Sequence, residues 1–259
     1  TFMFGMPMSP RGPELDLAGY ECVFVDEFEG DKLDTDVWYY RGEGVCSYRD
    51  GSNSSDAVSL RDGNLVIKQF YDENGKFGPD WYAATVALKQ KYLRGYFEIR
   101  CICNDDPDFW SAFWMQADAP YTPEISKGGI GGAEIDIFES LNNGNIWRHN
   151  SVSTNIHCSG MEGDTSGGLN SLSLGSFKAN KPYSTYNTYG FEWTEDEYIF
   201  YINGVETVRT SFADGVSQVP EQVIISLELP GTAPEDKSKT SEFIIDYIKI
   251  YQKEDAINE

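Results

Sequence analysis

Residues Gly131–Ser140 read Gly-Gly-Ala-Glu-Ile-Asp-Ile-Phe-Glu-Ser. Three carboxylates in this stretch, Glu134, Asp136 and Glu139, are interleaved with residues that favour β-strands. This pattern predicts a strand with one apolar face on a core and one acidic face in a cleft. Like charges on one strand face repel each other, and this repulsion lowers stability. We therefore expect the three acids to have a functional role.

The spacing of the acids predicts a β-bulge. Side chains alternate along a strand, so Glu134 and Asp136 share a face. Strict alternation would place Phe138 in the cleft and Glu139 in the core, where an unpaired carboxylate is costly. A bulge near Ile137–Phe138 would return Glu139 to the acidic face, because one extra residue shifts the alternation by one.

Two carboxyl groups on either side of a sugar linkage are what glycoside hydrolysis requires. In a retaining enzyme they lie about 5–5.5 Å apart, one acting as the nucleophile and the other as acid and base. With the bulge counted as one step, Glu134 and Glu139 have α-carbons roughly 13 Å apart at about 3.3 Å per step, so their side chains must lean together. Asp136 between them can hydrogen-bond to the nucleophile and keep the protonation states of the pair distinct.

Two other interpretations of the acidic strand remain open. The three acids could bind a cation, since calcium takes several oxygen ligands. They could also form nothing more than a solvated strand face.

Strand-like segments recur along the whole chain and predict an all-β fold. Pairs such as Asn74-Gly75 and Asn203-Gly204 separate them and suit tight turns. No segment keeps a long helical period with caps, and we expect only short helical turns near Asp34–Trp38 and Ser211–Asp214. Strands without helical crossovers imply antiparallel sheets packed face to face. The expected strands are Tyr20–Phe24, Val58–Leu60, Asn64–Gln69, Ala83–Leu88, Arg94–Cys101, Ser111–Gln116, Ala133–Glu139, Ser151–His157, Asn187–Thr194, Glu197–Ile202, Val205–Thr210, Gln222–Leu229 and Phe243–Tyr251.

The composition limits the possible partners. The chain has 259 residues and a formal net charge of −22. Negative charge repels phosphate backbones and anionic membrane surfaces, so we expect neither nucleic acid nor a membrane as partner, and a neutral glycan fits better. The acidity could also serve only to keep a secreted protein soluble. No apolar run approaches the roughly 20 residues of a membrane span, and the scattered cysteines indicate neither a zinc site nor a disulfide framework.

The chain reads as a single domain over residues 1–259, because no linker or repeat divides it. Residues 1–18 are expected to form an extended arm over the sheet, and residues 252–259 a tail. The Gly- and Ser-rich segments Ser159–Lys181 and Thr122–Gly132 are expected as loops around the cleft. The sequence begins without a signal peptide, so we expect that a leader has been removed from a secreted protein that acts as a monomer.

With its acidic motif, the chain resembles glycoside hydrolase family 16, the laminarinase and lichenase family. Glu134–Glu139 is similar to the bulged, laminarinase-like form of the family's motif. The resemblance covers roughly residues 20–251 in order, through the segments Val25–Phe28, Arg94–Arg100, Trp110–Met115, Tyr189–Thr194 and Ile245–Tyr251.

This resemblance implies a jelly-roll β-sandwich of two antiparallel sheets with a concave carbohydrate-binding cleft. It implies that Glu134 is the nucleophile, Asp136 the assisting acid and Glu139 the acid/base, in a retaining reaction without a catalytic cofactor.

The resemblance also implies a structural calcium ion. Its ligands would be backbone oxygens of Glu27 and Gly63 and the side chain of Asp246. Oxygen ligands from three strands suit calcium. The alternative is that Asp246 simply ends a strand.

Two tryptophans are candidates for sugar stacking, because sugar C–H groups pack on aromatic faces. Trp110 and Trp114 lie four residues apart on the segment expected beside the acidic strand, so alternation places both on one face. Either of them could instead belong to the core.

Three further segments supply candidate substrate-binding residues. Asn155 and His157 share a face that the resemblance directs into the cleft, where His157 could hydrogen-bond to Asp136 or to a sugar; the alternative for it is a purely structural histidine. Ser226 and Glu228 alternate with apolar residues and are also expected to face the cleft. Arg49, next to Tyr48 on a Gly-rich loop, is expected to reach a distal subsite.

These inferences predict an extracellular retaining endo-β-glucanase acting on β-1,3-glucan or mixed-linkage β-1,3/1,4-glucan. A galactanase of the same family, acting on an algal or mucin galactan, is the first alternative. A sulfated galactan would favour basic residues in the cleft, and the chain as a whole is poor in them. A glycan-binding jelly roll without catalysis is the second alternative, and the three intact carboxylates argue against it.

Overall fold

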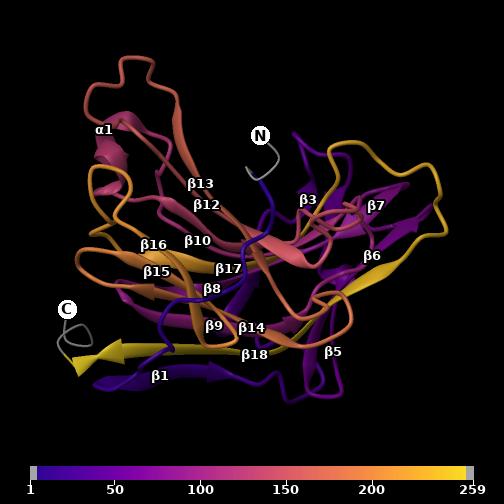
Figure 1. Cartoon of the computed structure of the whole chain (residues 1–259). Helices are drawn as coiled ribbons and strands as arrows, with labels where there is room; N and C mark the ends of the chain where they lie inside the picture. Colours follow the sequence, from indigo (N-terminus) through magenta and orange to yellow (C-terminus); the bar gives the residue numbers. More distant parts are fainter. Residues whose placement is uncertain (1–4, 255–259) are drawn as a thin grey trace.

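Alternating apolar residues give the strands one apolar face each, and two sheets pack these faces together. The computed structural model describes residues 5–254. Within them one sheet, called sheet A, has seven strands and the other, sheet B, has eleven. Figure 1 shows the sheets as stacked layers, with β1 (Tyr20–Asp26) and β18 (Ser241–Lys253) side by side in sheet B. The predicted all-β sandwich is confirmed. Its strand pairs within the described residues are antiparallel except for β4 (Ser52–Asn53) with β7 (Asp80–Ala83).

The strand order in each sheet shows which segments meet. Sheet A runs β13 (Leu169–Lys178), β12 (Ser151–Ser159), β11 (Glu134–Glu139), β10 (Trp110–Gln116), β17 (Glu221–Glu228), β8 (Thr85–Tyr92), β2 (Trp38–Tyr40). Sheet B runs β16 (Val205–Thr210), β15 (Tyr198–Ile202), β14 (Asn187–Trp193), β9 (Gly95–Ile102), β18, β6 (Asn64–Asp72), β7 (Asp80–Ala83), β4 (Ser52–Asn53), β3 (Gly44–Val45), with β1 paired to β18 and β5 (Val58–Arg61) paired to β6. The acidic strand β11 therefore lies inside sheet A, between β12 and β10.

The core lies between the two sheets. Phe138 of β11 stacks on Tyr189 of β14 with ring centroids 4.1 Å apart, and it meets Phe243 of β18 edge-on. Trp38 and Trp193 are also fully buried. Burial of such large aromatic surfaces is a main source of stability, at about 25 cal/mol per Å² of apolar area. This packing fixes the position of β11 against sheet B.

Helical structure is sparse. The helix α1 spans Pro123–Ser126, and two short 3-10 turns span Ser55–Ala57 and Lys127–Gly129. The turn predicted near Asp34–Trp38 is present, because Trp38 N–H donates to the Asp34 carbonyl at 2.9 Å. The predicted turn at Ser211–Asp214 is wrong, since these residues form no helix. No helix within residues 5–254 is long and apolar enough to cross a membrane.

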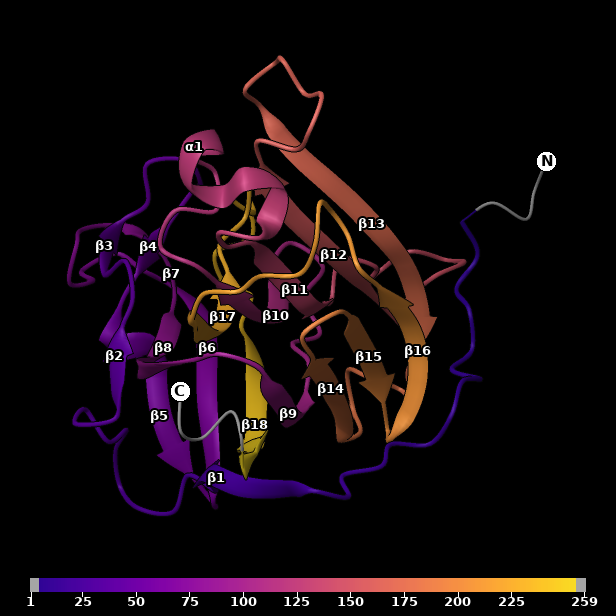
Figure 2. The ribbon, with the colours of Figure 1, turned by 90° about the vertical axis from the view of Figure 1, so that its left-hand side faces the viewer.

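Part of the predicted loop Ser159–Lys181 is a strand. Residues Leu169–Lys178 form β13, which pairs with β12 along its length at the edge of sheet A. In Figure 2, β12 and β13 run side by side near α1, and the loop that connects the two strands lies at the top of the view. The loop prediction failed because serine and glycine dominate this segment, and an edge strand needs less apolar surface than an inner one.

The two ends of the chain pack more tightly than predicted. Met8 bridges to Phe177 at the edge of sheet A, and Glu14 bridges to Val205 at the edge of sheet B. These bridges follow sheet edges, whereas Leu15 and Leu17 pack against Tyr96, Ile199 and Tyr201 on the face of sheet B opposite the core, so the predicted arm covers part of a sheet face. Residues 1–4 lie outside the described part. The predicted tail 252–259 starts too early, because Gln252 is buried and pairs with Glu21 in the β18–β1 ladder. Residues 255–259 lie outside the described part.

Candidate active site

A β-bulge in β11 brings the three acids to one face of sheet A. Across from β10, Phe138 pairs with Phe113 and Asp136 pairs with Trp114, so Ile137 is the extra residue. The same irregularity appears on the β12 side, between Asp136 and Glu139. The predicted bulge is confirmed. Its physical reason is that Phe138 fills the core while Glu139 returns to the acidic face.

The acids line a cleft of about 670 Å³ on the outer face of sheet A. Its walls come from β10, β11 and β17, and from the segments after β2 and β3. A cleft of this size suits an extended small-molecule or oligosaccharide chain. Its lining includes Arg41, Cys46, Tyr48, Arg49, Thr85, Trp110, Trp114, Gln116, Tyr121, Glu134, Asp136, Glu139 and Glu228.

Glu134 is half-buried and held through one oxygen. The side-chain amide of Gln116 donates to Glu134 Oε2 at 2.6 Å, and the hydroxyl of Tyr121 donates to the same oxygen. Gln116 lies directly across from Glu134 on β10, which explains the contact.

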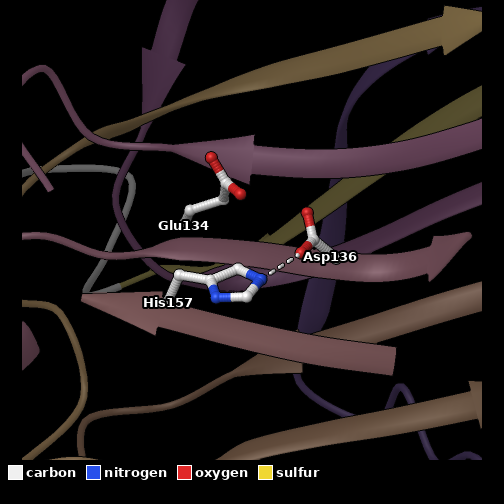
Figure 3. A group of neighbouring side chains, drawn as sticks. All are labelled: Glu134, Asp136 and His157. Atoms are coloured by element: carbon white, nitrogen blue, oxygen red, sulfur yellow. Dashed lines mark ion pairs between the residues drawn. The ribbon is translucent and has the colours of Figure 1, made fainter. Parts of the chain in front are cut away.

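Asp136 is buried at the floor of the cleft, and His157 is its partner. Figure 3 shows Glu134 and Asp136 on β11, and His157 reaching from β12 toward Asp136. His157 Nε2 lies 3.2 Å from Asp136 Oδ2. Burial raises the pKa of Asp136 well above its usual range, and the charges of Glu134 and Glu228 raise it further. Asp136 therefore favours its protonated form more than an exposed aspartate does.

Both oxygens of Glu139 accept hydrogen bonds. The indole Nε1 of Trp110 donates to Oε1 at 3.2 Å, and the amide of Asn155 donates to Oε2 at 2.9 Å. Burial, followed by the charge of Asp136, raises the pKa of Glu139 to about 8, although the two donors act in the opposite direction. A carboxyl group with this pKa carries a proton at neutral pH and can donate it.

A second contact, at the other ring nitrogen, orients His157. Its Nδ1 lies 2.6 Å from the hydroxyl oxygen of Ser171 on β13. The ring is thus held between Ser171 and Asp136 and is half-buried, so it does not belong to the core. The expected contact of His157 with Asp136 is present, and a contact with a sugar stays a prediction.

The candidate tryptophans and the β17 residues lie together. Trp110 and Trp114 are both half-buried and both line the cleft, so neither belongs to the core. The indole of Trp114 donates to the buried hydroxyl of Ser226 at 3.0 Å. Glu228 also lines the cleft, and burial raises its pKa, with opposing effects from Ser226 and Arg49.

Two arginines reach the cleft of this acidic chain. The Arg49 guanidinium lies 4.7 Å from the ring centroid of Trp110, and its Nε is buried without a hydrogen-bond partner among residues 5–254. The Arg41 guanidinium lies 4.8 Å from the ring centroid of Trp114. The inference that the chain is poor in basic residues holds for its composition, yet it does not describe the cleft.

Sequence reasoning missed Arg41, Gln116 and Tyr121. The signal for Gln116 was present, because it lies two residues after Trp114 and therefore shares its face. Arg41 and Tyr121 lie on connecting segments whose course depends on long-range packing, and no local pattern marks them.

One of the expected calcium ligands already has a charged partner. The Asp246 carboxylate accepts a hydrogen bond from Arg100 Nη1, as an ion pair between β18 and β9. Asp246 lies inside β18 and does not end it. The calcium site at Glu27, Gly63 and Asp246 stays a prediction, and Asp246 would have to exchange this ion pair for the cation.

Three neighbouring side chains on β11 and β12 have the spacing of a metal site. Within residues 5–254, Glu134, Asp136 and His157 are three groups whose ligand atoms lie within 4.8 Å of one another. Glu134 and Asp136 belong to the acidic strand, and His157 is the partner of Asp136. The same geometry therefore suits a bound cation or a pair of catalytic acids, and experiment distinguishes the two.

Comparisons with known proteins agree with this geometry. A family model described as "Beta-porphyranase A-D, GH16 domain" matches residues 22–252. The chain is 26% identical over 290 residues to glucan endo-1,3-beta-glucosidase A1 of Niallia circulans, covering 96% of this chain and 40% of that protein. It is 30% identical over 161 residues to the endo-1,3-1,4-beta-glycanase ExsH of Rhizobium meliloti, covering 61% of this chain and 30% of that protein. The chain thus spans well under half the length of these two relatives.

The fold also matches solved structures. The crystal structure of SCLam, a non-specific endo-beta-1,3(4)-glucanase from family GH16, superposes with a TM-score of 0.74 at 19% identity, covering 96% of this chain and 97% of that chain. At this identity the likeness shows the fold, and the family match over residues 22–252 shows the relationship. The chain belongs to glycoside hydrolase family 16.

Proposed function

We propose that this chain is a retaining endo-β-glucanase that hydrolyses β-1,3-glucan or mixed-linkage β-1,3/1,4-glucan. One observation carries the proposal: the bulge at Ile137 puts Glu134, Asp136 and Glu139 on one face of the cleft, with the pKa of Glu139 raised to about 8. Two carboxyl groups on one cleft wall, one of them with a raised pKa, are what double displacement needs. The similarity to glucan endo-1,3-beta-glucosidase A1 supports glucan as the substrate class, and the similarity to the endo-1,3-1,4-beta-glycanase ExsH supports a β-linked glycan.

In the proposed reaction, an oxygen of Glu134 attacks the anomeric carbon while the glycosidic bond breaks. Glu139 gives its proton to the departing sugar oxygen, and a glycosyl ester on Glu134 results. Water then attacks the same carbon and loses a proton to Glu139, and the bonding electron pair returns to Glu134. Asp136, buried and paired with His157, lies between the two acids on β11, and its charge helps to keep the proton on Glu139.

The other cleft residues are proposed to bind the polysaccharide. Trp110 and Trp114 offer faces for sugar rings, and Arg49 extends the wall beyond Trp110. Glu228 lines the cleft beside them, and Asn155 and His157 are proposed to contact the substrate from β12. Ser226 is fully buried and holds the Trp114 indole, so the expectation that it contacts a sugar is wrong. Because polysaccharides are too large to enter a cell, we propose that the protein works outside it, as a monomer and without a catalytic cofactor.

The decisive assay measures reducing-sugar release from laminarin, barley β-glucan and a panel of galactans. We expect release from one of the glucans, and a loss of several orders of magnitude in Glu134→Gln and Glu139→Gln variants that remain folded. Dialysis against EDTA should leave the rate unchanged, whereas a fall would support the cation interpretation. Unchanged hydrolysis by either variant would remove the mechanism.

A galactan is the second candidate substrate. Two observations favour it: the matching family model is described as a β-porphyranase domain, and Arg41 and Arg49 bring positive charge into the cleft. A guanidinium group is well suited to an anionic substituent on a sugar. Release from the galactan panel without release from either glucan would establish this candidate. Calorimetry that shows binding to a glycan without any product would instead establish a non-catalytic binding module.

A further inference from the structure

A chain of hydrogen bonds ends on one oxygen of Glu134. It starts at Arg41, which follows β2, and passes through Gln116 of β10. Tyr121, on the segment before α1, joins it at the same oxygen. These three residues come from separate parts of the chain, and Arg41 and Tyr121 belong to segments outside sheet A. Three separate segments of the protein thus converge on a single carboxylate oxygen.

The orientation of the Gln116 amide is fixed by its two neighbours. Its Oε1 accepts from Arg41 Nη2, and its Nε2 donates to Glu134 Oε2 at 2.6 Å. A guanidinium group can only donate, and an ionised carboxylate can only accept. The amide therefore cannot turn over without losing both hydrogen bonds.

Arg41 is itself held in place. Its guanidinium group lies 4.8 Å from the ring centroid of Trp114, as a cation–π contact. Its backbone N–H donates to the Thr85 carbonyl at 2.9 Å, which ties the residue to β8. The position of Arg41 is thus set by the rigid sheet, and Arg41 can in turn orient Gln116.

Tyr121 supplies the second donor to Glu134 Oε2. Gln116 Nε2 lies 3.2 Å from the Tyr121 hydroxyl, so the three polar groups form a closed set. Burial, followed by the charge of Glu134, raises the pKa of Tyr121 well above its usual range. The phenol therefore keeps its proton and remains a donor at every working pH.

We infer that Gln116 and Tyr121 hold Glu134 Oε2 so that Oε1 is the attacking oxygen, and that Arg41 is a positioning residue that acts through Gln116. This inference rests on the proposed function. In the glycosyl ester, Oε1 bonds to the anomeric carbon and Oε2 becomes the carbonyl oxygen. When water attacks that carbon, the Oε1–carbon bond breaks and negative charge returns to both carboxylate oxygens. Donors on Oε2 stabilise this charge, so they speed deglycosylation.

The test uses the 2,4-dinitrophenyl β-disaccharide of whichever sugar the wild type hydrolyses. Its good leaving group makes formation of the glycosyl ester fast. We expect kcat of Tyr121→Phe and Gln116→Ala to fall by about 10²-fold, the loss typical of removing one donor to a developing negative charge. KM should fall in parallel, dinitrophenolate should appear in a burst of about one per enzyme, and the intact mass should show the trapped disaccharide.

The role of Arg41 is separated by a double-mutant cycle. Arg41→Met should reduce the deglycosylation rate in the wild-type background and should have no further effect on that rate in Gln116→Ala. Tyr247→Phe is the matched control, because the Tyr247 hydroxyl donates to Glu98 at 2.7 Å in sheet B, away from the cleft. It should keep the wild-type kcat, the wild-type KM and the wild-type burst.

Each outcome decides the inference. A Tyr121→Phe variant with wild-type kcat, or with reduced kcat, raised KM and no burst, overturns it while leaving the proposed function intact. Equal effects of Arg41→Met in both backgrounds overturn the positioning role of Arg41. A wild type that releases sugar from no substrate and shows no burst overturns the proposed function, and the inference with it.

Discussion

The indole nitrogen of Trp110 lies 3.2 Å from Oε1 of Glu139, so one tryptophan both faces the cleft and contacts a carboxyl group of the acidic strand. The two roles can be separated, because phenylalanine keeps an aromatic face and lacks the N–H donor. Comparing Trp110→Phe with Trp110→Ala measures how much each role contributes to catalysis.

Trp110→Phe should mainly change the protonation of Glu139. The indole donor favours the ionised carboxylate, so its loss should move the basic limb of kcat/KM to higher pH. Trp110→Ala should in addition raise KM by roughly tenfold, since a stacking contact is worth about 0.5–1.5 kcal/mol. Steady-state kinetics over a pH series tests both effects. Equal KM values for the alanine variant and the wild type would show that Trp110 carries no sugar.

The pH profile should report Glu139 directly. Its pKa is raised to about 8 by burial and by Asp136, and a general acid must be protonated to act. We expect kcat/KM to fall by about tenfold per pH unit above this pKa. Asp136→Asn removes the neighbouring negative charge, so its basic limb should move to lower pH. A basic limb that stays in place in Asp136→Asn would contradict the assignment of the acid.

Stability should depend on pH through Glu221, at the start of β17. Its Oε1 accepts the Ala133 backbone N–H at 3.0 Å, next to Glu134, and its Oε2 is buried without a hydrogen-bond partner within residues 5–254. Burial raises its pKa from 4.5 to about 8. Between these two pKa values the folded state keeps a proton that the unfolded state releases. The contribution of Glu221 to the free energy of unfolding is therefore complete below pH 4.5 and is lost as pH rises through about 8.

Glu221→Gln should remove this dependence while still accepting the Ala133 hydrogen bond. The unfolding free energy of the variant should rise relative to the wild type by about 1 kcal/mol per pH unit between the two pKa values. Urea unfolding at several pH values across this window measures the difference. Parallel curves for the two proteins would show that Glu221 is ionised in the folded state.

The bulge can be tested by changing the number of residues between Asp136 and Phe138. Removing Ile137 takes out the extra residue, so strict alternation alone then keeps Phe138 in the core and Glu139 on the acidic face, and we expect this variant to fold and keep measurable activity. Inserting an alanine after Ile137 adds a second extra residue, which would direct Glu139 toward the core and Phe138 toward the cleft. We expect the insertion to abolish activity and to destabilise the fold by several kcal/mol, from a buried charge and an emptied aromatic site. An insertion variant with near-normal melting temperature and activity would contradict the role of the bulge.

The sequence allowed the acidic strand to be predicted in detail, because alternation and the cost of burying Glu139 left one solution. It also placed Trp110 and Trp114 on one shared face by their spacing, and the structure shows that both line the cleft. The polar edge strand β13 was missed, since its serines and glycine resemble a loop. The contacts of Arg41 and Tyr121 with Gln116 and Glu134 could not be predicted, because they depend on how distant segments return to sheet A.

The reaction's stereochemistry tests the central claim most directly. If Glu134 forms a glycosyl ester that water then opens on the same face, the new reducing end must keep the β configuration. Proton NMR of the anomeric signals during the first minutes of β-glucan hydrolysis, before mutarotation, distinguishes the two anomers. We predict that the β-anomer appears first. Initial release of the α-anomer would mean a single displacement, and it would contradict the account of Glu134 as the nucleophile.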